Sequence, residues 1–205
     1  ILSVNGHLNS FGFLKKRLMH IFLYASMTRA LTKEEIRKLG GEPSWGVAPA
    51  NPFGSSVRKI SGVGGDRIMV RNKFHFTSSL EASDRDIKRT VRDHDRSFQR
   101  RFSMLTDVQM EYRWGGRLCL SWNGVPVFGE IENGLFAACC QNGLGASKGT
   151  LSGILAAEYA SGVQSSYIED YLNGEQPTQL PPEPFATIGA STYLNWQEWR
   201  AGLEK

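Results

Sequence analysis

A short glycine-rich segment, Asn142-Gly143-Leu144-Gly145, contains the residue types that best fit a binding role. Glycines let a ligand approach the backbone closely. The segment leads into a helix-forming stretch, and the unpaired N–H groups and dipole at a helix start attract anionic or strongly polar groups. Lys148, one turn later, would add positive charge or point into solvent. The pattern predicts a polar-ligand site, and a plain strand-to-helix turn is the alternative.

The turn has to be held between a strand and a helix. Leu135–Cys140 is a short apolar run typical of a buried strand, and the polar segment Gly129–Gly134 is expected to connect it to the preceding strand. Ala146–Ala160 is rich in helix formers and is followed by Ser161-Gly162, a helix stop. The sequence therefore predicts a strand, a glycine turn and a helix.

Most of the remaining chain predicts strands joined by turns. Thr32 and Glu35 have the spacing of a capping box, so a helix is expected to begin there and to end at Gly40-Gly41. Glu42–Gly54 contains three prolines and is expected to be a loop, and a short helix is expected at Thr192–Leu203. The strand candidates are Ile1–Val4, His20–Met27, a hairpin of Ser56–Ser61 with Arg67–Phe76, and Val108–Ser121 with an interruption at Gly115-Gly116.

The clearest predicted helix is Ser83–Leu105. Its apolar stripe steps by three or four residues through Ile87, Val91, His94, Phe98, Phe102 and Leu105. Arginines lie off this stripe, interleaved with aspartates. The interleaved charges favour a solvated face with ion pairs over a nucleic-acid-binding helix, because no aromatic face accompanies the arginines.

Composition narrows the class of protein. The 205 residues carry a net charge of +4, too small an excess to indicate nucleic-acid binding. We expect no membrane span, and four scattered histidines and three cysteines offer no metal-ligand spacing. Adjacent Cys139-Cys140 and Cys119 form no disulfide framework, so a reducing, cytoplasmic location is expected. The opening Ile1-Leu2-Ser3-Val4 has no signal-peptide pattern and is expected to begin partway into a larger fold.

Several segments, taken together, resemble one enzyme family. The chain resembles the C-terminal half of FAD-dependent amine and amino-acid oxidoreductases, the D-amino-acid oxidase, glycine oxidase and sarcosine oxidase superfamily, and looks most like its gamma-glutamylputrescine oxidase branch. Ala30 replaces a common proline, and Leu144 stands where the family often has histidine. The segments that carry the resemblance are Asn5–Leu8, Thr28–Leu31, Gly65–Ile68, Glu111–Arg117, Asn123–Glu130 and Asn142–Gly145.

The resemblance implies an α+β chain, with an antiparallel-sheet substrate domain plus the last strand and helix of a Rossmann-like FAD domain. The expected division is 1–30 as a remnant of the FAD domain, 31–121 as the substrate domain, 122–175 as the C-terminal part of the FAD domain and 176–205 as a proline-rich tail with a short helix. The family's pyrophosphate-binding G-x-G-x-x-G is missing. Gly62-Val63-Gly64-Gly65 leads into a strand, whereas that fingerprint requires a helix.

The resemblance also implies a reaction: oxidation of a C–N bond of a small amine or amino acid. A hydride equivalent passes to flavin N5, the imine hydrolyses, and molecular oxygen or another acceptor reoxidises the flavin. FAD is the implied cofactor, with no metal. The residues implied to contact it are Gly115, Gly116, Asn142, Gly143, Leu144, Gly145 and Lys148.

The substrate would meet Arg71, His75 and Trp114. Arg71 or His75 could bind a carboxylate, and Trp114 could form a wall of the site. Exposed strand residues and a core tryptophan are the simpler readings of these positions, and covalent flavin attachment at Cys119 is a minor alternative. No catalytic acid or base stands out.

Two functions remain open from the sequence, and nucleic-acid binding by the Ser83–Leu105 helix is a third, weaker one. The chain is either half of a flavoenzyme that needs the missing FAD-domain half, or a non-catalytic binding or structural module.

Overall fold

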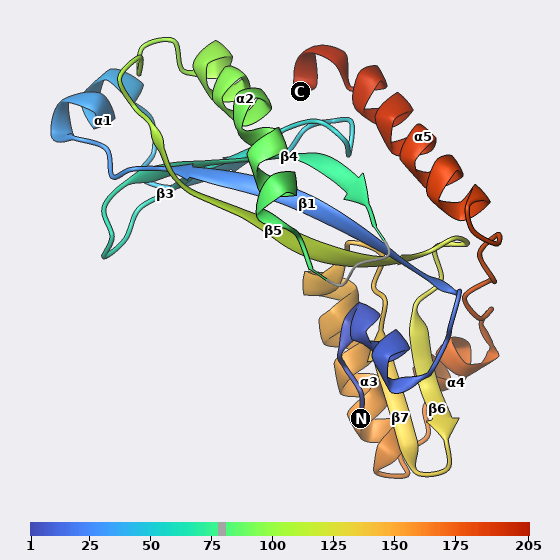
Figure 1. Ribbon diagram of the computed structural model, residues 1–205. Helices are drawn as coiled ribbons and strands as arrows, with labels where there is room; N and C mark the ends of the chain where they lie inside the picture. The colour runs from blue at the N-terminus through green and yellow to red at the C-terminus, as the bar shows by residue number, and fades with distance from the viewer. Residues whose placement is uncertain (78–80) are drawn as a thin grey trace. The chain divides into compact units, whose positions relative to one another are not determined.

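The computed structural model describes residues 1–77 and 81–205 and confirms the predicted α+β class (Figure 1). The chain forms two compact units. The first unit contains Ile1–Ile21, Phe76–Leu80 and Arg117–Gly189, and the second contains Phe22–His75, Glu81–Gly116 and Ala190–Lys205. In the described part of the chain, no helix is long and apolar enough to cross a membrane.

A five-stranded sheet has the strand order β2-β3-β4-β1-β5. Strands β2, β3 and β4 pair antiparallel, with Val57 opposite Val70 and Lys59 opposite Ile68. The predicted hairpin is confirmed, whereas β2 lies inside the segment predicted to be a loop. Strand β5 continues through Gly115-Gly116 without interruption. The bounds are β1 Leu18–Thr28, β2 Trp45–Val47, β3 Ser56–Ile60, β4 Arg67–Phe76 and β5 Met110–Ser121.

The first two helices begin at capping boxes. Helix α1 (Lys33–Leu39) is capped by Thr32, whose hydroxyl accepts from the Glu35 N–H, while the Glu35 carboxylate accepts from the Thr32 N–H. Helix α2 (Asp84–Arg101) is capped by Ser83 in the same way, with Asp86 as the reciprocal partner. These bonds satisfy N–H groups that have no partner inside the helix.

Helix α2 covers the second unit's core. Its predicted stripe turns inward, so that Phe98 and Phe102 pack with Ile68 and Val70 of β4. The buried His94 contacts the Ser26 hydroxyl at 2.6 Å. Aspartates of the outer face pair with cations, as in Arg113–Asp95 at 2.7 Å. These pairs agree with a solvated, ion-paired surface.

Helix α5 (Phe185–Arg200) begins well before the predicted start at Thr192 and is followed by a 3₁₀ turn, η3 (Gly202–Glu204). Its buried residues within the second unit are Ala190, Leu194 and Glu198.

In the first unit, α3 packs on a two-stranded antiparallel sheet of β6 and β7 (Figure 1). Phe128 and Ala138 of the sheet form a core with Leu155 and Ala156 of α3 and Ile168 of α4. The bounds are β6 Val127–Glu132, β7 Leu135–Cys139, α3 Thr150–Ala160, α4 Ser166–Asn173, a 3₁₀ helix η1 Asn5–Phe11 and a π-helix η2 Gly145–Gly149.

The predictions for two segments of this unit are wrong. Glu130 and Glu132 belong to strand β6, so Gly129–Gly134 is mostly a strand rather than a connector. Ile1–Val4 forms no extended strand: only Leu2 makes a bridge, parallel to Ala137. The polar residues Glu130 and Glu132 are in a strand because β7 pairs with them, and Leu2 forms a bridge because Ala137 lies beside it. Such pairing leaves no pattern in the sequence.

Candidate functional site

The predicted glycine turn borders a cleft of about 310 Å³ in the first unit. The cleft lies where β7 passes through the turn into η2 and α3. Its lining residues are Ser3, Asn5, Leu118, Cys119, Ala138, Cys139, Gln141, Gly143, Gly145 and Gly149. Gly143 and Gly145 therefore border an open space rather than packed side chains.

The cleft lies at the carboxyl ends of two parallel segments. The Leu2 N–H donates to the Phe136 carbonyl at 2.7 Å, and the Ala138 N–H donates to the Leu2 carbonyl at 3.2 Å. Since both segments run in the same direction, Ser3 and Cys139 reach the same edge. Ligands of α/β folds bind outside the carboxyl ends of parallel strands, and this cleft has that location.

Two asparagine side chains hold the turn in a strained backbone path. Cys140, Asn142 and Gly143 all have positive φ, at 59°, 51° and 85°. The Asn142 side chain accepts from the Ser121 N–H at 2.9 Å and donates to the Cys140 carbonyl at 3.0 Å. Asn5, which sequence reasoning missed, accepts from the Cys140 N–H at 3.2 Å. The side chain of Asn142 thus fixes the turn instead of facing the cleft as a ligand group.

The cleft offers both hydrogen-bond donors and a hydrogen-bond acceptor to a ligand. A Cβ added to Gly143 or Gly145 would have no atom within 4 Å, so a ligand can approach the backbone. The first N–H groups of the helix have no intrahelical partner. Gln141 donates to the Ser152 hydroxyl at 2.7 Å, which leaves its buried Oε1 without a hydrogen-bond partner among the described residues. A π-helix, a rare element often found at functional sites, begins the helix at Gly145.

The other residues predicted near the turn lie differently. Lys148 is exposed and lines a second pocket of about 280 Å³ together with Asp170 and Glu175. Leu144 is exposed.

Cys119 lines the cleft and is buried, with a free thiol. A hydrogen bond with Cys140, and burial, raise the pKa of Cys119, so this thiol stays protonated at neutral pH. Burial also raises the pKa of Cys139 to about 12. Protonated thiols are poor nucleophiles, which makes covalent attachment through these residues unfavourable.

The residues predicted to meet the substrate belong to the second unit. Arg71 of β4 donates to the Ser56 hydroxyl at 2.7 Å, and burial lowers the pKa of its guanidinium. His75, further along β4, lies 3.5 Å from the Tyr24 hydroxyl. Burial, with the Asp86 charge, raises the pKa of Tyr24 to about 12. Sequence reasoning missed Tyr24 because it looks like one more apolar residue of a buried strand.

The two glycines of β5 have different surroundings. A Cβ on Gly115 would lie 3.1 Å from the Tyr24 ring and 3.0 Å from Ala82, whereas Gly116 has open space. Gly115 therefore makes room for Tyr24, and only Gly116 leaves space for a ligand. Trp114 is partly exposed on the same strand. Within this unit, Tyr24 thus contacts both residues: its hydroxyl lies near His75 and its ring lies beside Gly115.

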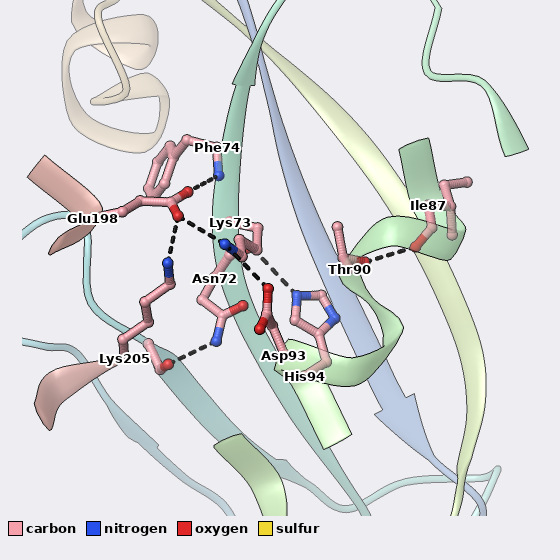
Figure 2. Close-up of polar contacts among 10 residues, drawn as sticks. Asn72, Lys73, Phe74, Ile87, Thr90, Asp93, His94, Glu198 and Lys205 are labelled. Atoms are coloured by element: carbon pink, nitrogen blue, oxygen red, sulfur yellow. Dashed lines mark hydrogen bonds and ion pairs between the residues drawn. The ribbon is translucent and has the colours of Figure 1, made fainter. Parts of the chain in front are cut away.

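A polar cluster elsewhere in the second unit has a structural role (Figure 2). The Glu198 carboxylate of α5 accepts from the Phe74 N–H at 2.8 Å and pairs with Lys73 at 3.0 Å, and Lys73 also pairs with Asp93 of α2 at 3.1 Å. Lys205 contacts the same carboxylate. Every charge in this cluster has a partner. In the described ranges, 1–77 and 81–205, no group of three or more His, Cys, Asp or Glu residues is placed to hold a metal ion.

Comparison with known proteins identifies the fold. No protein-family model matches the sequence, and no curated protein matches it. Solved structures do match. Glycine oxidase from Geobacillus kaustophilus is 17% identical with a TM-score of 0.53, covering 78% of this chain and 39% of that chain. L-proline dehydrogenase from P. horikoshii is 17% identical with a TM-score of 0.56, covering 82% of this chain and 44% of that chain.

A third structure agrees with these two. L-amino acid deaminase from Proteus myxofaciens, solved with anthranilate, is 14% identical with a TM-score of 0.51, covering 73% of this chain and 42% of that chain. The chain spans less than half the length of each of these proteins. At these identities the similarity concerns the fold: the chain has the fold of part of three enzymes named for their action on amino acids.

Proposed function

We propose that this chain is the distal half of an FAD-dependent oxidoreductase that acts on the C–N bond of an amine or amino acid. The observation that carries the proposal is the cleft at the glycine turn. It combines a helix start, two glycines and the carboxyl ends of two parallel segments, at Leu2 and β7. The fold shared with amino-acid enzymes supports the same assignment.

The residues of the cleft fit one edge of a flavin. The ring carries negative charge at its pyrimidine edge when reduced, and the N–H groups at the helix start, from Gly145 onward, would stabilise that charge. The Gln141 Oε1, which has no hydrogen-bond partner in the part of the chain that the structure describes, would accept a hydrogen bond from an N–H or hydroxyl of the cofactor. The open space at both glycines allows the contact. We therefore assign Gln141, Gly143 and Gly145 to cofactor binding.

Bound FAD would supply the chemistry by accepting a hydride equivalent from the carbon that bears the amine, after which water hydrolyses the imine. The protein would bind and orient the substrate. Among the described residues Arg71 bonds one hydroxyl, that of Ser56, and its other donors could bind a substrate carboxylate. Trp114 would form an apolar wall, and His75, held by Tyr24, would contact a polar substrate group.

The same proposal accounts for apolar surface on α3. Leu151 and Ile154 are exposed on this helix, which packs on the sheet through Leu155 and Ala156. Helices of Rossmann-like domains are covered by neighbouring elements. We propose that the missing pyrophosphate-binding half, in the same protein or in a separate chain, covers this face.

Reconstitution tests the function. The chain is coexpressed with a chain that carries the strand–G-x-G-x-x-G–helix half of a related enzyme, and the complex is purified. We expect a yellow complex with a flavin absorption band and amine-dependent peroxide release or dye reduction. A complex that forms but stays colourless and inactive with FAD would contradict the enzyme assignment and favour the alternative, a binding or structural module.

A further inference from the structure

Helix α2, which packs on the five-stranded sheet (Figure 1), carries exposed basic side chains on the side opposite its buried stripe. Each of them has another three or four residues away, so they lie within one arc of about 120° along the helix. The arc is centred opposite His94, which is fully buried. We call this set the α2 basic row: Arg85, Lys88, Arg89, Arg92, Arg96 and Arg100.

The aspartates of α2 lie outside this arc, and two of them bond to the sheet. Asp93 pairs with Lys73 of β4 at 3.1 Å. Asp95 pairs with Arg113 of β5 at 2.7 Å. Charges that alternate along the sequence are therefore separated in space, since these aspartates pair with strand residues while the basic side chains of the helix face solvent.

One member of the α2 basic row has an acidic partner in the described part of the chain: Arg89 pairs with Asp86 at 3.4 Å. The other five form no ion pair or side-chain hydrogen bond within residues 1–77 and 81–205. Like charges three or four residues apart destabilise a helix. The row therefore weakens α2 unless an anion from outside the chain neutralises it.

The positive charge of the protein is concentrated in the unit that contains α2. The second unit has 19 lysines and arginines against 13 aspartates and glutamates, a net charge of +6. The first unit has 5 against 7, a net charge of −2. The net charge of +4 for the whole chain is thus the sum of a basic unit and a slightly acidic one, and a basic surface attracts polyanions.

The shape of the α2 basic row favours a linear polyanion over a lipid surface. From Arg85 to Arg100 the row extends about 22 Å, at 1.5 Å per residue, and its members follow one another at about one helical turn. A helix that lies on a membrane inserts an apolar face, and the apolar face of α2 is already packed in the core through Phe98 and Phe102.

The residue types of the row favour phosphate groups. Five of its six members are arginine, whose planar guanidinium can donate two parallel hydrogen bonds to one phosphate. The row contains no aromatic side chain on which unpaired bases could stack, so it suits the outside of a duplex better than a single strand. An evenly charged phosphate backbone matches the regular spacing of the row.

We propose that the α2 basic row binds the phosphate backbone of a nucleic-acid duplex without reading its sequence. Contacts with phosphates position a protein on a duplex and carry no sequence information. The proposal does not rest on the flavin assignment, since no residue of the row lines the cleft at the glycine turn.

Fluorescence anisotropy of a labelled DNA duplex of about 20 base pairs, titrated with the full chain at about 50–200 mM KCl, measures the binding. With five phosphate contacts we expect the logarithm of the association constant to fall with the logarithm of the salt concentration with a slope of about −4.5. Affinity should then fall roughly 500-fold across this range. A second duplex of unrelated sequence should bind equally well.

Substitutions within the row should change the salt dependence. Arg96→Ala should reduce the size of the slope by about 1, and Arg92→Ala/Arg96→Ala by about 2. The matched control is Arg58→Ala, which also removes one positive charge from the second unit and should leave the slope unchanged. Its neighbour Val57 faces the core that α2 covers, so the exposed Arg58 projects from the opposite face of the sheet.

Poly-glutamate and vesicles of anionic lipid, tested at the same salt concentrations, are the other two arms. The proposal is overturned if the duplex does not bind at about 50 mM salt, or if the folded Arg92→Ala/Arg96→Ala variant keeps the wild-type slope. Tighter binding to poly-glutamate or to the vesicles than to the duplex would also overturn it, in favour of an acidic protein or a lipid surface. Alanine forms helices better than arginine, and circular dichroism checks that the variants are folded. If the double variant is not folded, Arg96→Ala decides.

Discussion

The Glu198 carboxylate accepts a hydrogen bond from the Phe74 N–H at 2.8 Å, which bonds helix α5 directly to the main chain of β4. The bond lies at an irregular point of the strand, since the preceding residue, Lys73, has a φ of +65°. Lys73 pairs with the same carboxylate at 3.0 Å. One buried acidic side chain therefore satisfies a free N–H, neutralises a lysine and anchors the C-terminal helix.

Removing this carboxylate should destabilise the protein. Glu198→Ala leaves the Phe74 N–H without its acceptor and removes the carboxylate that Lys205 and Lys73 share, although Lys73 keeps its pair with Asp93. We expect a loss of about 2–4 kcal/mol in the free energy of unfolding, measured by urea denaturation. The control is Glu34→Ala, which removes the exposed pair with Lys38 and should cost less than about 0.5 kcal/mol. Equal losses for the two variants would contradict the anchoring role.

The pKa of Glu35 should be low. The bidentate Arg29 guanidinium, at 2.7 and 2.9 Å, lowers the pKa of Glu35 to about 2, with the capping bond from Thr32 as a smaller cause. Because the folded pKa lies below the unfolded value of about 4.3, this carboxylate contributes stability above that value and loses it as the pH falls towards 2. NMR titration should find the low pKa in the wild type and a value near 4 in Arg29→Ala. A wild-type pKa near 4 would exclude the pairing.

Neighbouring glycines of β5 should respond differently to the same substitution. Gly115→Ala places a methyl group 3.0 Å from Ala82 and 3.1 Å from Tyr24, so we expect a loss of about 1–2 kcal/mol in unfolding free energy. Gly116→Ala meets open space and should leave stability unchanged or raise it by up to about 1 kcal/mol. Thermal unfolding of both variants checks the assignment, and the reverse order would show that Gly115 is not packed against Tyr24.

Filling the cleft should block flavin without unfolding the chain. Gly145 has an ordinary φ and open space around it, so Gly145→Leu should fold yet occupy the proposed cofactor edge. We expect at least about a tenfold weaker FAD affinity in the reconstituted complex, equivalent to about 1.4 kcal/mol. Gly62→Leu, also in open space but in the second unit, is the control. Unchanged flavin binding in Gly145→Leu would place the cofactor elsewhere.

Local patterns predicted much of this structure. Both capping boxes, the inward stripe of α2 and the hairpin of β3 and β4 follow from residues close together in the sequence. The strand before the glycine turn and the helix after it were also predictable, because a short apolar run and a following helix former each leave a local signal. The early start of α5 and the small strand β2 were missed, since prolines nearby predict loops.

The sequence by itself determined that a glycine turn joins a buried strand to a helix, because backbone freedom and apolar spacing are properties of adjacent residues. Only the tertiary structure decided what surrounds that turn: the parallel bridge at Leu2, the bond from the Cys140 N–H to Asn5, and the Gln141 Oε1, which has no partner within residues 1–77 and 81–205. The bridge and the bond join residues far apart in the chain, and the third feature depends on a partner that is absent. A long-range contact and an absent partner leave no pattern in the order of amino acids. For the same reason Gly115 looked like a ligand-contacting glycine, although the Tyr24 ring occupies the space beside it.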